Sequence, residues 1–323
     1  MFLKKFLLTF LILSFLNTQC WAATTWYLCS GGGTWNSNSV TIFTSVQADQ
    51  VGCTGATGAP ASGGGDSVAL NANSGPLTIG FTPPSIAAFN MTNYSTSAYS
   101  PMANFATYTM TMTGALTLEG PLSGSVGGDI SGYTSVTLTN NATSGDGLRP
   151  LLLLGSTQTW TSGGYTYGGA VQNQSVSAII TMVGNFSVNQ LTVASKNVTF
   201  SGAYNATIGT LNLYSEGSSF NFIFPAGQTL AVSNALNIQG SYSTFAPTVK
   251  SPSTTPFFLN YNGPLNAQNV YQGIFQYVNA SNGKYPIFNW YGGASSTGNT
   301  NVLYRDPTYL YRLTSVNGTV SIN

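Results

Sequence analysis

Residues 189–200 read NQLTVASKNVTF, and residues 209–222 repeat the same kind of phrase as GTLNLYSEGSSFNF. Leu191 and Leu211 occupy matching places in the two phrases, and Leu236 takes the same place in the next one, after a slightly longer interval. Apolar and polar residues alternate in each phrase, which is typical of a short strand with one buried face. A strand motif that returns at an interval of ~20 residues or slightly more indicates a solenoid.

The same spacing appears earlier in the chain. Leu116 and Val136 lie one such interval apart in alternating segments, and so do Val68 and Phe89. Gly, Ser, Thr and Asn fill the polar positions, and these residues favour turns and strands over helix interiors. We therefore expect an all-β protein with a parallel β-solenoid at residues 66–284. A β-sandwich is the alternative, because short strands with turn signals also suit that fold.

The N-terminal residues predict the compartment. Two lysines precede an apolar run at residues 6–16, and Cys20-Trp21-Ala22 provides small residues where a signal peptidase cleaves. This pattern predicts a signal peptide at residues 1–22 and a secreted protein, extracellular or at the cell surface. A lipidated Cys20 is the weaker alternative, because the residues before it match a lipoprotein signal poorly.

The segment 23–65 does not show the repeat pattern, and it contains both cysteines of the predicted mature chain, Cys29 and Cys53. An even pair in an exported chain predicts a disulfide bond. Because uncovered strand edges recruit partners, we expect this segment to cap the first turn of the solenoid. Residues 285–323 are expected to form an aromatic-rich cap at the other end, with late strands at Thr308–Thr314 and Thr319–Ile322.

Charge is scarce. The 323 residues include 8 Lys/Arg, 7 Asp/Glu and no His, and removal of Lys4 and Lys5 leaves six basic against seven acidic residues. No basic patch suits nucleic acid or an anionic membrane surface, and no later apolar run reaches the length of a membrane span. We expect neither nucleic-acid binding nor membrane insertion. A hydrophobic content of 42% excludes a disordered chain.

Four segments carry a family resemblance: GDSVAL at 65–70, the repeats of 189–251, QNVYQGIFQYVNA at 268–280 and SSTGNTNVLY at 295–304. They resemble the start, the coil series, the last coil and the closing motif of secreted bacterial right-handed parallel β-helix surface proteins. The closing motif departs from Ser-x-x-Gly-Asn-x-x-Trp-x-Phe, since Val302 replaces Trp and Tyr304 replaces Phe. The resemblance covers about two thirds of the mature chain. It implies a right-handed β-helix with capped ends, of an adhesin or fibre type that has few catalytic members.

Polysaccharide lyases and hydrolases also use right-handed β-helices, and they need paired carboxylates or a base beside calcium. Asp129 and Asp146, separated by slightly less than one repeat and with Arg149 nearby, are the best candidates for such a site. Their glycine neighbours favour bends as the role of both aspartates. Without histidine, an Asp-rich calcium repeat or a phosphate-loop motif, the chain predicts no metal and no cofactor. We expect no enzyme, with a polysaccharide lyase or hydrolase as the alternative.

Aromatic residues crowd the last quarter of the chain. Aromatic rings stack on sugars and are favoured at protein interfaces, although filling the core is the other role open to them. The candidates for glycan or interface contacts are Tyr285, Trp290, Tyr291, Tyr304 and Tyr309. Low charge and few lysines favour self-association through the solenoid ends. We therefore predict a structural or adhesive surface protein, with a self-assembling fibre subunit included, and a glycan-binding module as the alternative.

Overall fold

The structure is a computed structural model that describes residues 23–37, 40–55, 57–61, 65–99, 102–120, 122–123, 130–139, 150–154, 157–241, 245–290, 296–305, 315–316 and 319–320. In this described part the regular structure is β-strand, with three short 3₁₀ helices: η1 (Gln47–Asp49), η2 (Tyr94–Thr96) and η3 (Leu265–Ala267). None of these helices has the length and apolar character needed to cross a bilayer. The predicted signal peptide, residues 1–22, lies outside the described residues.

Two long sheets run along the molecule, and a third covers only its N-terminal part. The first has the strand order β4 (Thr57–Gly58), β3 (Phe43–Thr44), β1 (Thr25–Leu28), β5 (Ser67–Ala69), β7 (Ala88–Asn90), β10 (Ala115–Leu118), β13 (Ser135–Leu138), β15 (Thr157–Thr161), β17 (Ala178–Val183), β19 (Val198–Ser201), β21 (Phe220–Ile223), β23 (Pro247–Lys250) and β26 (Ile274–Gln276). The third and shortest has the order β2 (Gly33–Trp35), β6 (Leu77–Ile79), β8 (Ala103–Asn104) and β11 (Leu122–Ser123).

The second sheet carries the candidate site described below. Its main order is β9 (Met110–Thr111), β12 (Ile130–Ser131), β14 (Pro150–Leu154), β16 (Tyr167–Val176), β18 (Phe186–Ala194), β20 (Ala206–Tyr214), β22 (Thr229–Gln239), β25 (Gln268–Tyr271), β28 (Ile287–Trp290) and β29 (Val302–Arg305). The long strand β22 pairs through its first half with β24 (Phe257–Tyr261) and through its second half with β25. Strand β24 in turn pairs with β27 (Val278–Asn279).

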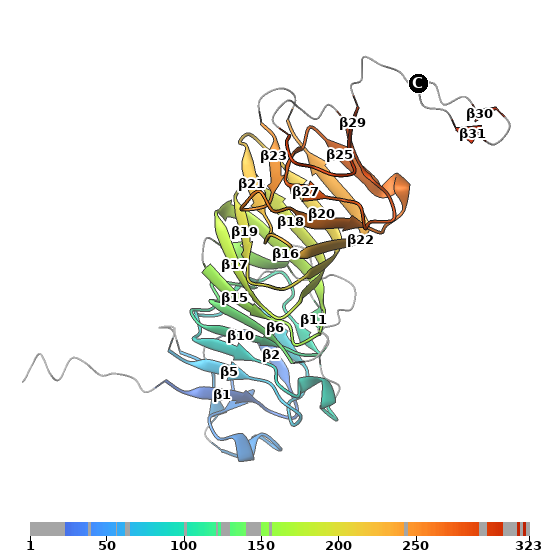
Figure 1. Cartoon of the computed structure of the whole chain (residues 1–323). Coiled ribbons are helices and arrows are strands. Elements are labelled where there is room, and N and C mark those ends of the chain that lie inside the picture. The colour runs from blue at the N-terminus through green and yellow to red at the C-terminus, as the bar shows by residue number, and fades with distance from the viewer. Residues whose placement is uncertain are drawn as a thin grey trace, which may run out of the picture.

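The predicted repeats pair with one another residue for residue. Leu116 is the parallel partner of Val136, Leu191 is the partner of Leu211, and Leu211 is the partner of Leu236. Each strand therefore lies on the equivalent strand of the next turn, and Figure 1 shows the strands stacked along one axis from β1 to β29. From β1 onward the strands in these ladders pair in parallel, which confirms the β-solenoid and excludes the β-sandwich, whose strands pair antiparallel. The right-handed winding stays a prediction.

The interior is filled by side chains that alternate with outward ones along each strand. In β20 the buried residues include Leu211 and Leu213, while Thr210 and Tyr214 are only partly buried. Aromatic rings run through successive turns in contact. Trp160 meets Phe186 at a centroid distance of 4.8 Å, and Phe186 meets Phe200 at 5.3 Å. Because each turn is too small to bury its apolar face alone, this continuous core is what holds the turns together.

The two ends differ in their pairing. At the N-terminal end, β1 and β2 pair in parallel with β5 and β6, so the solenoid ladders extend into the segment 23–65. Beyond β1 the first sheet continues with β3 and β4, both antiparallel to their neighbours. At the other end β29 follows β28, and β30 (Ser315–Val316) pairs antiparallel with β31 (Thr319–Val320). The expected strand Thr308–Thr314 lies outside the described residues, as do the last residues of Thr319–Ile322. The capping roles stay predictions.

Candidate functional site

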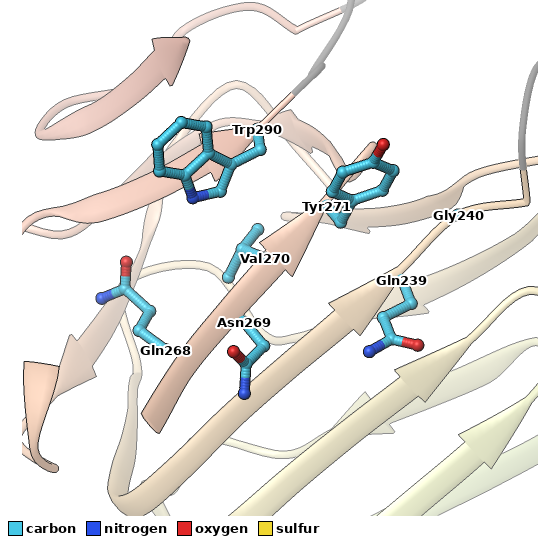
Figure 2. A pocket seen from close by; sticks show the side chains of 7 residues that line it. All are labelled: Gln239, Gly240, Gln268, Asn269, Val270, Tyr271 and Trp290. Carbon is cyan, nitrogen blue, oxygen red and sulfur yellow. The ribbon is translucent and has the colours of Figure 1, made fainter. Parts of the chain in front are cut away.

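A groove of about 380 Å³ opens on the outer face of the second sheet, near the C-terminal end of the solenoid. We call it the Trp290 groove. It lies over the strands β22, β25 and β28, and Figure 2 shows Asn269 and Tyr271 extending from β25 between Gln239 and Trp290. The residues that line it are Gln239, Gly240, Gln268, Asn269, Val270, Tyr271 and Trp290.

The strand register places these side chains. Gln239 is the parallel partner of Tyr271, and Tyr271 is the partner of Trp290. Side chains alternate between faces, so the neighbours Val270 and Asn289 point inward and are fully buried, while Trp290 is 42% exposed. Three successive turns thus present Gln239, Tyr271 and Trp290 on the same outer face.

An amide ladder runs beside this face. Asn212 Nδ2 donates to Thr192 Oγ1 at 3.1 Å, Asn237 Nδ2 donates to Asn212 Oδ1 at 2.7 Å, and Asn269 Nδ2 donates to Asn237 Oδ1 at 2.9 Å. Each amide in the series therefore fixes the next one. The ladder ends in the groove at Asn269, whose Oδ1 receives no donor from the described part of the chain. This end of the ladder offers a ligand an acceptor that is already oriented.

The two glutamines of the groove differ in role. Gln268 is buried, donates from Nε2 to Pro286 O at 3.0 Å and accepts at Oε1 from Phe288 N at 2.6 Å, so its amide is committed to the fold. Gln239 is exposed, and its side chain makes no hydrogen bond with any described residue. None of the described residues lining the groove is charged. The site can therefore supply neutral donors and acceptors beside aromatic faces.

A second groove, of about 470 Å³, lies on the first sheet over β1, β5 and β7. Two of its asparagines are engaged in hydrogen bonds. Asn90 Oδ1 accepts from Thr92 N at 2.9 Å and from Thr92 Oγ1 at 2.6 Å, and Asn71 Nδ2 donates to Gln50 Oε1 at 2.8 Å. The lining of this second groove includes one aromatic ring, Tyr27, whereas that of the Trp290 groove includes two, so the Trp290 groove is the better candidate for binding.

The residues predicted to contact glycans or partners lie in different surroundings. Trp290 lies in the groove, and Tyr304 is 40% exposed on β29, where its hydroxyl accepts from Asn299 Nδ2 at 3.1 Å. Burial raises the pKa of Tyr304. Tyr304 is the partner of the inward-facing Asn289, so it does not share the row of Trp290. Tyr285 packs against the core, with Lys284 Nζ 5.1 Å from its ring centroid. Tyr291 and Tyr309 lie outside the described residues.

The predicted disulfide is present. Cys29 and Cys53 are bonded, with their Cα atoms 5.4 Å apart. Cys29 is buried at the end of β1, whereas Cys53 lies in a turn after η1. The bond therefore ties the segment that carries η1 to the edge of the first parallel turn.

Two of the described acidic residues, Glu119 and Asp66, serve the fold. Glu119 accepts from Asn93 N at 2.7 Å, from Ser95 Oγ at 2.5 Å and from Thr139 Oγ1 at 2.6 Å. Asp66 accepts from Thr24 N, Trp26 Nε1 and Ala61 N at 2.9 to 3.0 Å. Burial alone would raise the pKa of each carboxyl, but these hydrogen bonds outweigh it and lower the pKa of both.

The alternative catalytic trio is not placed by the structure, since Asp129, Asp146 and Arg149 lie outside the described residues. In the described part, no three His, Cys, Asp or Glu side chains gather into a set that could hold a metal ion.

Sequence reasoning singled out Trp290 but missed Gln239 and Asn269. A signal was present, because Asn212, Asn237 and Asn269 each stand between two residues that point inward. Asparagine is usually a turn residue, whereas in these repeats it forms a ladder on a strand face.

Comparison of the chain with protein-family models gave no match. Comparisons with curated proteins and with solved structures also gave none. The assignment of a function therefore depends on the geometry of the site.

Proposed function

We propose that the protein is a secreted adhesive surface protein that binds uncharged glycans in the Trp290 groove. The observation that carries this proposal is the exposed Trp290, in register with Tyr271 and flanked by the exposed amide of Gln239 and by Oδ1 of Asn269.

The chemistry of the groove suits a sugar. A pyranose ring has an apolar C–H face, which stacks on aromatic rings, and a rim of hydroxyl groups, which need donors and acceptors. Trp290 and Tyr271 supply the rings, Gln239 supplies both donors and acceptors, and Asn269 Oδ1 supplies an acceptor. An acidic sugar would find no cation among the described lining residues, so the lining favours neutral ones.

Several features support binding without catalysis. Glu119 and Asp66 are committed to hydrogen bonds that join chain segments, and neither lines the groove. The disulfide between Cys29 and Cys53 supports an oxidising, extracellular location. A rod with little charge and a ligand groove near one end suits attachment rather than turnover.

The proposal is tested on an array of neutral glycans built from glucose, galactose, mannose and N-acetylglucosamine, followed by calorimetry on the glycans that bind. Trp290→Ala and Tyr271→Ala should each weaken binding at least tenfold, which corresponds to about 1.4 kcal/mol, because each removes a stacking surface. Tyr204→Ala is the matched control, since Tyr204 is 40% exposed, close to the 42% of Trp290, but lies outside the groove. It should bind as the parent protein does.

Two results would contradict the proposal. One is a Trp290→Ala variant that keeps the parent affinity while its thermal unfolding is unchanged. The other is the recovery of shortened glycans after incubation, which would show cleavage and favour the polysaccharide-degrading alternative.

A further inference from the structure

The Trp290 groove is one end of a longer row of side chains. Tyr214 in β20 is the partner of Gln239, Gln239 is the partner of Tyr271, and Tyr271 is the partner of Trp290. Residues in parallel register share a face and follow the sheet at about 4.8 Å per strand. The row Tyr214, Gln239, Tyr271 and Trp290 therefore runs along the solenoid axis through four successive turns.

The row has defined ends. Before Tyr214, the partner in β18 is Ala194, which has no ring to offer. After Trp290, the partner is Arg305 in β29, the last strand of this sheet. Two rings therefore lie next to each other at the C-terminal end, and a third ring lies at the N-terminal end beyond Gln239.

The amide ladder lies beside this row, two residues earlier in each of β20, β22 and β25. The Tyr214 hydroxyl donates to Asn212 Oδ1 at 3.1 Å, which ties the first ring of the row to the ladder. Burial raises the pKa of Tyr214, so its hydroxyl stays protonated as this bond requires. Side chains that are already fixed lose little conformational freedom on binding, so Tyr214 and the ladder asparagines are organised before a ligand arrives.

We infer that the ligand is a linear, uncharged polysaccharide that lies along the solenoid axis, with successive sugars over successive turns. This inference rests on the proposed function and adds the length and direction of the ligand. In an extended β-linked glycan the rise per sugar is close to the spacing between strands, so each pyranose meets the next member of the row. The rings of Tyr214, Tyr271 and Trp290 stack on sugars, while Gln239 forms hydrogen bonds with the hydroxyl groups of the sugar that lies over it.

The test uses neutral β-1,4-linked oligosaccharides of glucose, mannose and N-acetylglucosamine, each as a series from one to six units, measured by calorimetry with the full mature chain. Affinity should rise with each unit up to about four, one for each strand of the row, and then level off. Tyr214→Ala should weaken the four-unit ligand about tenfold and leave the two-unit ligand unchanged, because two sugars are held by Tyr271 and Trp290 alone.

Tyr214→Phe is the matched variant, since it keeps the ring and loses the bond to Asn212. It should bind four units nearly as well as the parent. If one unit binds as tightly as four, or if Tyr214→Ala affects short and long ligands equally, the axial arrangement is wrong while glycan binding stands. If no member of any series binds, the axial arrangement is overturned, and a negative result on the glycan array overturns the proposed function separately.

Discussion

At the scale of single residues, Glu119 connects three turns of the solenoid. Its carboxylate follows β10 and accepts from Asn93 and Ser95 in the turn before and from Thr139 in the turn after. The side chain is 4% exposed. A buried carboxylate is stable only when such donors replace the water it has lost, so this residue fastens the neighbouring turns rather than acting on a substrate.

Replacing Glu119 with Gln should lower the free energy of unfolding at neutral pH by about 2 kcal/mol, because weaker neutral hydrogen bonds replace the charge-assisted bonds that the carboxylate accepts. The pKa of Glu119 is lowered in the folded protein, so its ionised form contributes stability above the ordinary value of 4.5. That contribution is lost as the pH falls from 4.5 through the lowered pKa. Parent and variant should therefore converge in acid, as measured by urea unfolding across pH.

The exposed Glu216 provides the control for this experiment. Glu216→Gln should follow the parent at every pH. A Glu119→Gln variant whose deficit stays constant from neutral pH into acid would show that the carboxylate charge is not what stabilises the turns.

The outward side chains of the site show where prediction from sequence stops. The pairing of Cys29 with Cys53 follows from their number alone, and Trp290 follows from the aromatic crowding near the C-terminus. The packing of Tyr285 against the core could not be predicted from the sequence. Tyr285 lies in the loop before β28, where strand alternation does not apply, so its position in the sequence does not show whether its ring points inward or outward. The hydrogen bonds between the ladder asparagines could not be predicted either, because they depend on the strand register, which is known only from the structure.

At the scale of strands, the spacing of apolar residues predicts pairing where turns keep a constant length. Leu191 pairs with Leu211 at the predicted interval, but Phe222 pairs with Val249 across a longer stretch of chain. The extra residues lie in the connections, which lengthen without disturbing the stacked strands. The position of β24 outside the main order of the second sheet could not be predicted, because β22 pairs with β24 through its first half and with β25 through its second half.

The assignment of faces in β22 leads to a prediction about stability. Leu236 is fully buried, so Leu236→Ala should cost about 3 kcal/mol through loss of burial and the cavity it leaves. Asn237 points outward and makes two ladder bonds, so Asn237→Ala should cost only about 1 kcal/mol. The order of the thermal unfolding midpoints, parent above Asn237→Ala above Leu236→Ala, checks this prediction. The reverse order of the two variants would mean that the faces of β22 are misassigned.

At the scale of the whole molecule, we expect the ends of the solenoid to determine whether copies associate. The chain carries Lys196, Lys250 and Lys284 as its only lysines after the predicted signal peptide, and its net charge is too small for copies to repel one another. On the last strand of the second sheet, Leu303 is 44% exposed and Tyr304 is 40% exposed. These features favour contact between the ends of neighbouring copies, since exposed strand edges with few charges pair readily.

We predict that the mature protein self-associates at tens of micromolar and that deletion of residues 315–323, which include the paired strands β30 and β31, reduces the association. Sedimentation velocity of the two proteins at matched concentrations is the measurement. A parent protein that sediments as a monomer at these concentrations would contradict the prediction without the deletion. Loss of glycan binding in the deletion variant would show instead that the C-terminal residues support the groove.

Equivalent turns stack residue for residue, so the length of the solenoid can change by whole turns. Leu211 pairs with Leu191, and both are buried. If one repeat were deleted, each residue lost would be replaced by the equivalent residue of the next repeat. Such a chain would be shorter by about 4.8 Å, the distance between neighbouring strands, with its two ends otherwise unchanged. Gene duplication and loss of repeats can thus set the distance between the Trp290 groove and the N-terminal end without changing either one.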